Sequence, residues 1–425
     1  MISGQDIVLV SSVEWGFLWQ IPQEVSLRLA RAGNRVLYVE NMGVRAPSLR
    51  DAGRVALRLA RSLGSVPSRG VRRVAPEVRV VSPLVFPPFG GPRQHAANRA
   101  LLRLQIARAA RRLGMRDPVI WTFLPTDAAL ELVRLLATPA SVIVYHCTAD
   151  FSQLTPRAAE LARSEDALLR LSDLVFANCP PLAELCRRLN DNVHMLPPGV
   201  DLTAFPPEGS GDDARSDRLP DHDGSASARG DGRATSEGQT TRRRPVIGYV
   251  GGLHKHVDFE LLAALARARP QWSWVLVGPR QTEVNGLDSL PNVRLLGQRP
   301  HGELARHINE MDVCLVPYLN NAATATVMPV KVNEYLAAGK PVVSTDLPAM
   351  REFNERHGVV ITADARPDSF LGAVERALAS AGDAQESERR RGVAALSEWG
   401  ERLRVMSDLI EGAARRKRVG RAPAP

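Results

Sequence analysis

Short apolar runs alternate with amphipathic helical patterns along most of this 425-residue chain. The first unit pairs an expected strand over residues 6–11 with a helix over 23–32 and a second strand over 35–40. Continuous β-branched runs of this kind are typical of strands buried on both faces of a parallel sheet. The alternation therefore predicts an α/β fold made of doubly wound, Rossmann-like units.

A polar segment divides the chain in two. Residues 206–244 are rich in Gly, Ser, Asp, Arg and Thr and nearly free of large apolar side chains. Such a segment cannot bury enough apolar surface to order itself, so we interpret it as a disordered linker. The predicted domains are 1–205 and 245–390, followed by a C-terminal helix and basic tail over 391–425.

The chain is basic, with 55 Lys and Arg against 46 Asp and Glu and a formal net charge of +9. This balance favours solubility and a general attraction to anions, and the specific partners that it suggests are anionic lipid or a phosphate-bearing substrate. Nucleic acid is a weaker alternative, and we expect none to bind. Arg108, Arg111, Arg112 and Arg116 lie at helical spacing without the interleaved aromatic residues of a base-stacking surface.

No pattern in the chain indicates a metal, a cofactor or a membrane span. Cys147, Cys179, Cys186 and Cys314 lie in apolar surroundings without CxxC or metal-ligand spacing, as in a reducing compartment. Residues 1–16 resemble a strand more than a signal peptide, and no apolar run approaches the ~20 residues of a membrane span. We therefore expect a cytoplasmic protein, peripheral at most on the inner face of the plasma membrane.

Common catalytic motifs are also missing. The sequence contains no GxGxxG turn, no GxxxxGK[ST] loop, and no HExxH or GxSxG motif. This argues against a dinucleotide oxidoreductase, a P-loop enzyme, a zinc protease and an α/β-hydrolase.

The most informative stretch is 327–345, VMPVKVNEYLAAGKPVVST. It predicts a helix from Val330 to Ala338 whose first turn offers free N–H groups to a diphosphate. Lys331 adds a positive charge in that turn. Glu334, on the same face, is placed to accept hydrogen bonds from both hydroxyls of a ribose. By spacing alone, Lys331 and Glu334 equally fit an ordinary surface pair.

This stretch resembles the donor-binding signature of retaining GT-B glycosyltransferases, the group 1 or family 4 enzymes. In that signature a glutamate, here Glu334, precedes an AxGxPVV turn, here 337–343. Further family-like motifs follow in order at 198–205, 246–253, 292–297 and 312–317.

The resemblance implies two facing Rossmann-like domains, with the nucleotide sugar bound mainly by the second and the acceptor by the first. It also implies a C-terminal helix packed back on the first domain. The expected reaction is a metal-independent transfer with retention, in which the nucleotide sugar is a substrate and no cofactor takes part.

The sequence departs from the family at two places. The signature usually carries a second glutamate, and its position holds Thr326. The basic residues that often follow the first glycine turn are absent near Gly252 and Val257, so His254, Lys255 or Lys331 is expected to replace them, with Arg280 as a further candidate. The donor-binding residues expected on these grounds are Gly251, Gly252, Lys255, Arg280, Thr326, Val330, Lys331 and Glu334.

In the first domain, candidate residues follow two predicted strands at the ligand-facing edge of the sheet. Glu14 is a catalytic candidate, and Trp15 is expected to stack on an acceptor sugar, although Trp15 and Trp19 equally fit core packing. His146 and Asp150 are the other catalytic candidates. The alternatives are a structural role for His146 and helix capping by Asp150.

We therefore predict a glycosyltransferase that uses a saccharide or lipid-linked acceptor in the biosynthesis of a cell-surface polysaccharide or glycolipid. Thr326 and the missing basic pair keep open a catalytically degraded sugar-nucleotide-binding scaffold. A GT-B sugar-nucleotide epimerase is the third alternative.

Overall fold

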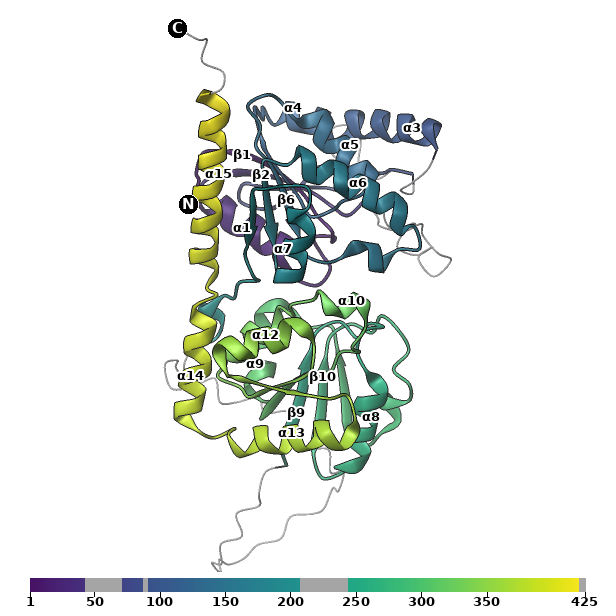
Figure 1. Ribbon diagram of the computed structural model, residues 1–425, viewed down its shortest axis with the longest axis vertical. Coiled ribbons are helices and arrows are strands. Elements are labelled where there is room, and N and C mark those ends of the chain that lie inside the picture. Colours follow the sequence, from purple (N-terminus) through teal and green to yellow (C-terminus); the bar gives the residue numbers. More distant parts are fainter. Residues whose placement is uncertain (43–70, 87–90, 207–243, 420–425) are drawn as a thin grey trace, which may run out of the picture.

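A computed structural model describes residues 1–42, 71–86, 91–206 and 244–419 (Figure 1). Two α/β domains lie one above the other along the long axis, and the last two helices run beside both of them. The expected linker lies almost wholly outside the described residues.

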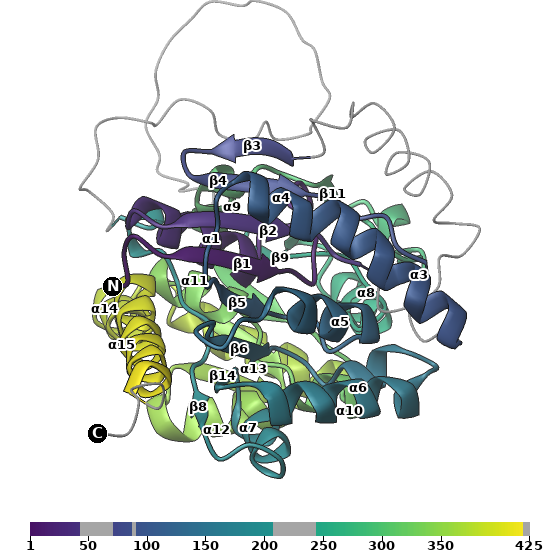
Figure 2. The ribbon, with the colours of Figure 1, turned by 90° about the horizontal axis from the view of Figure 1, so that it is seen from above.

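The first domain is built on an eight-stranded sheet in the order β3-β4-β2-β1-β5-β6-β7-β8 (Figure 2). All neighbouring strands are parallel except β3, which pairs antiparallel with β4 at the edge. The strands are β1 (Asp6–Val10), β2 (Arg35–Val39), β3 (Val71–Ala75), β4 (Val78–Val81), β5 (Val119–Thr122), β6 (Ile143–Cys147), β7 (Leu174–Ala177) and β8 (Val193–Met195). The helical elements are α1 (Ile21–Arg31), α3 (Pro92–Leu102), the π-helical turn η2 (Arg103–Ala107), α4 (Arg108–Arg112), α5 (Asp127–Leu136), the 3-10 turn η3 (Phe151–Leu154), α6 (Ala158–Leu171) and α7 (Pro180–Arg187).

The second domain carries a six-stranded parallel sheet in the order β11-β10-β9-β12-β13-β14. Its strands are β9 (Val246–Val250), β10 (Ser273–Val277), β11 (Val293–Gly297), β12 (Val313–Val316), β13 (Val342–Thr345) and β14 (Val360–Ala363). Its helical elements are α8 (Phe259–Ala268), η5 (Leu287–Ser289), η6 (His301–Glu303), α9 (Leu304–Asn309), α10 (Ala322–Ala325), α11 (Lys331–Ala337), α12 (Pro348–His357) and α13 (Pro367–Ala379). The short turn η4 (Leu202–Ala204) precedes the second domain, and α14 (Ala384–Ala395) and α15 (Trp399–Val419) follow it.

The central strands are buried on both faces, as the apolar runs predict. In β1, Ile7 and Leu9 face the core that also holds α15, whereas Val8 and Val10 face the core under α3 and α5. This alternation follows from the two-residue period of a strand. The prediction of two Rossmann-like sheets is confirmed.

The chain crosses between the domains at two segments that pair with each other. The Val200 N–H donates to the Ser397 carbonyl at 2.8 Å, and the Trp399 N–H donates to the Val200 carbonyl at 3.1 Å. A Cβ atom at Gly199 would lie closer than 3.0 Å to the Trp399 indole, so the indole packs directly on the bare backbone. The two crossings therefore form one connection.

Helix α15 packs back on the first domain, as expected. Trp399, Leu403, Met406 and Ile410 are buried in the same core as β1. Near its other end, the Lys417 ammonium lies 2.6 Å from an Asp173 carboxylate oxygen and donates to the Ser141 carbonyl at 2.6 Å. The helix is thus fixed at both ends.

Arg28 on α1 links the crossing to the first domain. Its guanidinium pairs with Glu24 on the same helix, with Asp201 at 3.1 Å and with Glu398 at 3.6 Å. Asp201 and Glu398 belong to the two crossing segments, so one half-buried arginine connects both to α1.

Gly199→Ala is expected to destabilise the protein by about 1–3 kcal/mol, because the added methyl group overpacks against the Trp399 indole. Unfolding in urea measures the change. Gly392→Ala on α14 is the matched control, since nothing lies within 4 Å of its added Cβ atom. Equal stability of the two variants would contradict the packing described for Gly199.

Candidate functional site

A glycine turn and a lysine meet where β9 ends. Gly251 has φ of +147°, a conformation that favours glycine, and a Cβ atom there would lie 2.9 Å from the Lys331 ammonium nitrogen. A Cβ atom at Gly278 would in turn collide with the Gly251 carbonyl. The bare backbone of this turn therefore lies directly against the Lys331 side chain.

Neutral groups hold the Lys331 ammonium. It donates to the Tyr318 hydroxyl at 2.5 Å, lies 3.4 Å from the Tyr249 hydroxyl, and lies 4.8 Å from the centre of each ring. It forms no ion pair with a carboxylate of the described residues. Such a cation keeps its charge for an anionic ligand.

His254 lies beside Tyr318, and the centres of the two rings are 5.5 Å apart. Burial, together with the nearby Lys331 charge, lowers the pKa of His254 to about 3. This imidazole is therefore neutral at pH 7, and of His254 and Lys331 only the lysine supplies positive charge at the turn.

Glu334 lies one turn along α11 from Lys331 and is half-buried. Burial raises the pKa of its carboxyl group, His301 and Lys331 lower it, and Glu24 of the first domain raises it. Charged groups of both domains therefore act on this carboxyl group. The helix itself begins at Lys331, with Val330 as its N-cap.

The loop between β1 and α1 brings the first domain to this junction. The Trp19 indole stacks on the His301 imidazole of the second domain, with ring centres 5.6 Å apart and planes inclined by 21°. Its N–H donates to Glu24 at 2.7 Å. Leu18 lies 3.2 Å from where a Cβ atom would stand on Gly252. The loop thus lies against the glycine turn.

Trp15 packs within the first domain. Its ring meets Tyr38 edge-on at 5.1 Å and Trp19 at 5.8 Å, and its backbone N–H donates to Glu40 at 3.0 Å. Glu14 is half-buried beside it, in the same loop. This packing favours the core role for the Trp15 ring over stacking on a sugar.

His146 lies in the core of the first domain and is 1% exposed. Its ring centre lies 4.7 Å from that of Phe123, its Nε2 lies 3.1 Å from the Asn178 amide oxygen, and burial lowers its pKa to about 4. An imidazole enclosed in this way does not reach a bound substrate. The geometry favours the structural alternative.

Asp150 caps the turn η3. Its carboxylate accepts hydrogen bonds from the Ser152 N–H at 3.1 Å and the Ser152 hydroxyl at 2.5 Å. The capping alternative is thus realised in the structure. Asp150 is half-buried, and its second carboxylate oxygen accepts a hydrogen bond from the Gln153 amide at 3.4 Å.

The remaining predicted donor residues differ in placement. Arg280 pairs with Glu283 at 2.8 Å and with Asp288 at 2.9 Å, so its own loop neutralises it. Lys255 is exposed.

Thr326 and Val330 lie where the domains touch. The Thr326 hydroxyl is buried without a hydrogen-bond partner among the described residues, and its carbonyl accepts from the Cys179 thiol of the first domain at 3.2 Å. Val330 packs against the first-domain core. The structure therefore brings Gly251, Gly252, Lys331 and Glu334 together, whereas the Arg280 guanidinium is paired within its own loop.

Sequence reasoning did not identify Tyr249, Tyr318 and His301 as parts of this site. Tyr249 lies in β9 and Tyr318 follows β12, which are neighbours only in the sheet order. His301 lies in a turn after β11 and is recognised only by its stacking on Trp19. No local sequence pattern marks these residues.

His146→Phe is expected to flatten the dependence of stability on pH. The unfolded chain protonates this histidine below its ordinary pKa of 6.5, whereas the folded protein does so only near 4. The free energy of unfolding therefore falls by about 1.4 kcal/mol per pH unit as the pH is lowered through this window. Urea unfolding at several pH values measures the slope, and an unchanged slope in the variant would contradict the burial of a neutral imidazole.

Known proteins resemble this chain in sequence and in fold. Residues 244–380 match the family model for glycosyl transferases group 1. A putative teichuronic acid biosynthesis glycosyltransferase, TuaH, of Bacillus subtilis (strain 168) is 32% identical over 160 residues, which are 36% of this chain and 40% of the relative. A GDP-mannose-dependent alpha-mannosyltransferase of Mycolicibacterium smegmatis is 28% identical over 205 residues, 48% of this chain and 46% of that protein. The chain thus spans less than half the length of these curated relatives.

Solved structures share the whole fold. Sucrose-phosphate synthase from Thermosynechococcus elongatus superposes with a TM-score of 0.68 at 18% identity, over 96% of this chain and 98% of that chain. HepE of Anabaena, in complex with UDP and glucose, does so with a TM-score of 0.58 at 15% identity, over 96% of this chain and 100% of that chain. The fold of the whole chain is therefore GT-B, and its second domain is similar to the group 1 glycosyltransferases over residues 244–380.

Proposed function

We propose that this protein transfers a glycosyl group from a nucleoside diphosphate sugar to a saccharide or lipid-linked acceptor. The observation that carries the proposal is the Lys331 ammonium, which lies against the glycine turn and is held by neutral groups among the described residues, with Glu334 one helical turn away. A diphosphate fits beside the cation and the bare backbone. A ribose fits at the carboxylate.

In the proposed reaction, the bond between the anomeric carbon and the diphosphate oxygen breaks while an acceptor hydroxyl oxygen bonds to that carbon. Negative charge grows on the leaving diphosphate, and Lys331 stabilises it by electrostatic attraction in a site where tyrosine rings limit water. The acceptor proton passes to a base, for which Glu14 and Asp150 are the candidates. By family resemblance, the anomeric configuration is retained.

The names of similar proteins support this choice of substrates. The HepE structure contains UDP and glucose, which supports a nucleotide-sugar donor. The curated relatives are named for teichuronic acid biosynthesis and for mannosyl transfer from GDP-mannose, which supports a role in cell-surface polysaccharide or glycolipid synthesis. We propose that the protein acts in the cytoplasm. No helix in the described part of the chain is long and apolar enough to span a membrane.

One observation favours a second candidate function, a sugar-nucleotide-binding scaffold without transferase activity. Thr326 stands where the family usually has a glutamate that contacts the transferred sugar, and its hydroxyl is buried against the first domain. The scaffold would bind a nucleotide sugar without transferring or hydrolysing it. A panel of nucleotide sugars, read first by thermal shift and then by sugar transfer, separates the two functions.

Glu334→Ala is expected to weaken the affinity for a nucleoside diphosphate on the order of hundredfold, because two charge-assisted hydrogen bonds to the ribose are lost. Isothermal titration with UDP and GDP measures it. Glu355→Ala, which removes an exposed glutamate from α12 of the same domain, is the control and should bind as the unmodified protein does. Unchanged affinity in Glu334→Ala would remove this carboxylate from the site.

Lys331→Met is expected to lower kcat by about 10²–10³-fold with the donor that the panel identifies, because a charge on the leaving diphosphate goes unstabilised. Lys255→Met is the matched comparison, since Lys255 lies exposed just after the same glycine turn. A larger loss in Lys255→Met than in Lys331→Met would assign the cation to Lys255 instead.

A further inference from the structure

One helical segment of the first domain carries positive charge without any negative charge. From Pro92 to Met115 the chain contains six arginines and no aspartate or glutamate. These residues form α3, the π-helical turn η2 and α4, a continuous rod on the outside of the domain (Figure 2).

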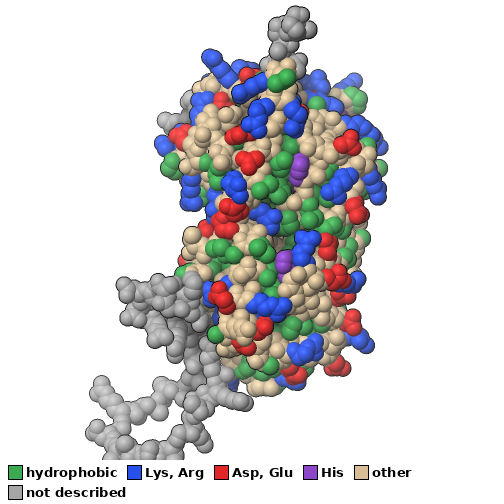
Figure 3. Space-filling model, turned by 60° about the vertical axis from the view of Figure 1, so that its left-hand side comes forward, with side chains coloured by type: hydrophobic (Ala, Val, Ile, Leu, Met, Phe, Trp, Pro, Cys, Tyr) green, Lys and Arg blue, Asp and Glu red, His purple; other side chains and the backbone are tan. Residues whose placement is uncertain are grey.

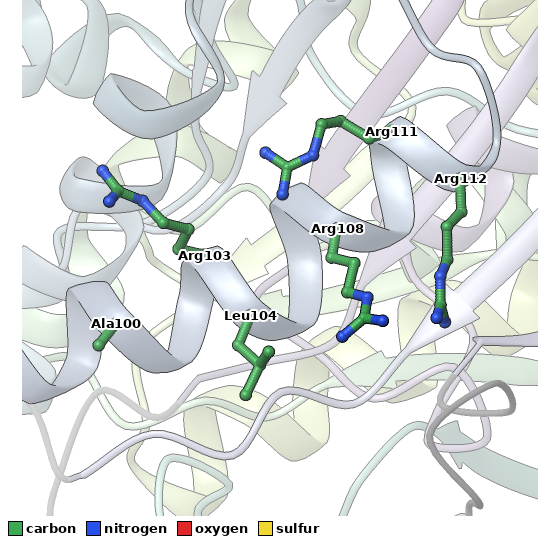
Figure 4. Close-up of a pocket in the computed structure, with 6 residues that line it drawn as sticks. All are labelled: Ala100, Arg103, Leu104, Arg108, Arg111 and Arg112. Atoms are coloured by element: carbon green, nitrogen blue, oxygen red, sulfur yellow. The ribbon is translucent and has the colours of Figure 1, made fainter.

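The rod has a buried and an exposed face. Leu102, Ile106, Ala109 and Ala110 are buried in the core beneath it. The exposed residues recur at helical spacing and form a stripe that we call the arginine face (Figure 4). The arginine face consists of Ala100, Arg103, Leu104, Arg108, Arg111 and Arg112, which line a shallow hollow of about 710 Å³.

Three cations of this face are not neutralised by any of the residues that the structure describes. Arg103, Arg108 and Arg111 are exposed and form no ion pair with a described residue. Arg99, on the same helix, instead pairs with Glu131 at 2.6 Å. Leu104 lies among these arginines and is 59% exposed. The face thus combines these three guanidinium groups with an apolar side chain.

The arginine face lies at one end of the molecule. In Figure 1, α3 and α4 occupy the end of the long axis that is farther from the second domain, and the C-terminal end of α15 reaches the same end. That end of α15 bears Arg416 and Arg418, both exposed. Figure 3 shows further Lys and Arg side chains around this end on another side.

We propose that the arginine face docks on the surface of a membrane that contains anionic phospholipids. Guanidinium groups form bidentate hydrogen bonds with phosphate, and the headgroup layer supplies a dense array of phosphates. Leu104 enters the boundary between headgroups and acyl chains, where an exposed apolar side chain among cations is stabilised.

The residue types of the face favour lipid over nucleic acid. The arginine face contains no aromatic side chain on which bases would stack. An apolar residue at its centre adds nothing to the binding of a hydrophilic polyanion, but it does add to the binding of a bilayer. When docked, the protein would stand with its long axis away from the bilayer, and the junction of the domains would lie across the first domain from the lipid.

Sedimentation with vesicles tests the proposal. The unmodified full chain is expected to bind vesicles of equal parts phosphatidylcholine and phosphatidylglycerol, and not vesicles of phosphatidylcholine alone. The triple variant Arg103→Ala, Arg108→Ala, Arg111→Ala should lower the partition coefficient about hundredfold, since each arginine near an anionic surface contributes about fivefold. Leu104→Ala should lower it about tenfold, and added salt should weaken binding throughout.

The matched control removes the same charge elsewhere. Arg267, Arg356 and Arg376 are exposed on α8, α12 and α13 of the second domain, and their triple alanine variant should bind vesicles as the unmodified chain does. If both triple variants lost vesicle binding equally, the net charge of the protein would explain the binding, and the proposal would be overturned. Failure of the unmodified chain to bind anionic vesicles would also overturn it, and retention on dextran sulfate in that case would assign the face to a soluble polyanion.

Affinity for UDP and GDP separates this inference from the proposed function. The arginine-face variants should bind nucleotide as the unmodified chain does, because the altered residues lie on the outer side of the first domain. A chain that binds anionic vesicles but no nucleotide would contradict the proposed function while leaving the docking face standing.

Discussion

The paired crossing of the chain between its domains is the constraint on which the rest of the structure depends. Two backbone hydrogen bonds join Val200 to the segment that leads into α15, and the Trp399 indole fills the space that Gly199 leaves open. Arg28 then ties both crossings to α1 through Asp201 and Glu398. Because α1 follows the loop that carries Leu18 and Trp19, the position of this loop over the second domain depends on the same connection.

The proposed donor site combines a lysine that neutral groups hold with a partly desolvated carboxyl group. The Lys331 ammonium is held by hydroxyl groups and aromatic rings, and the neighbouring His254 is neutral at pH 7. The carboxyl group of Glu334 is partly desolvated, and Glu24 across the junction raises its pKa further. A ligand that brings negative phosphate to the lysine and hydroxyl donors to the carboxylate would complement both groups.

The sequence predicts most of the fold because the central strands bury both faces and appear as apolar runs. The elements that it does not predict lack this signal. Strand β3 (VRRVA) is a partly exposed edge strand with two arginines, and β8 has only three residues. Helix α14 buries little besides Arg390 and Ala394, and the Arg390 guanidinium donates to the Gly339 carbonyl instead of facing water. Polar helices of this kind have no apolar stripe to detect.

Some residues of the candidate site are likewise predictable from the sequence and others are not. Lys331 and Glu334 lie in one helix, so their proximity follows from spacing, and Gly251 is marked by its turn. Their combination with tyrosines from β9 and the segment after β12 depends on sheet order, which spacing does not reveal. His146 is a residue for which the sequence suggests a functional role and the structure favours a structural one. A histidine at the end of a predicted strand looks functional in sequence, and only the three-dimensional packing places it among aromatic rings.

The contact between Leu18 and the bare backbone at Gly252 bears on how such a chain diverges. A larger residue at 252 would meet Gln281 of its own domain and Leu18 of the first domain, so the two domains are in close contact at this position. Residue exchanges on the two sides of the junction must therefore be matched to each other. A chimera that carries the second domain of a relative would therefore also need the β1–α1 loop of that relative for its two domains to pack.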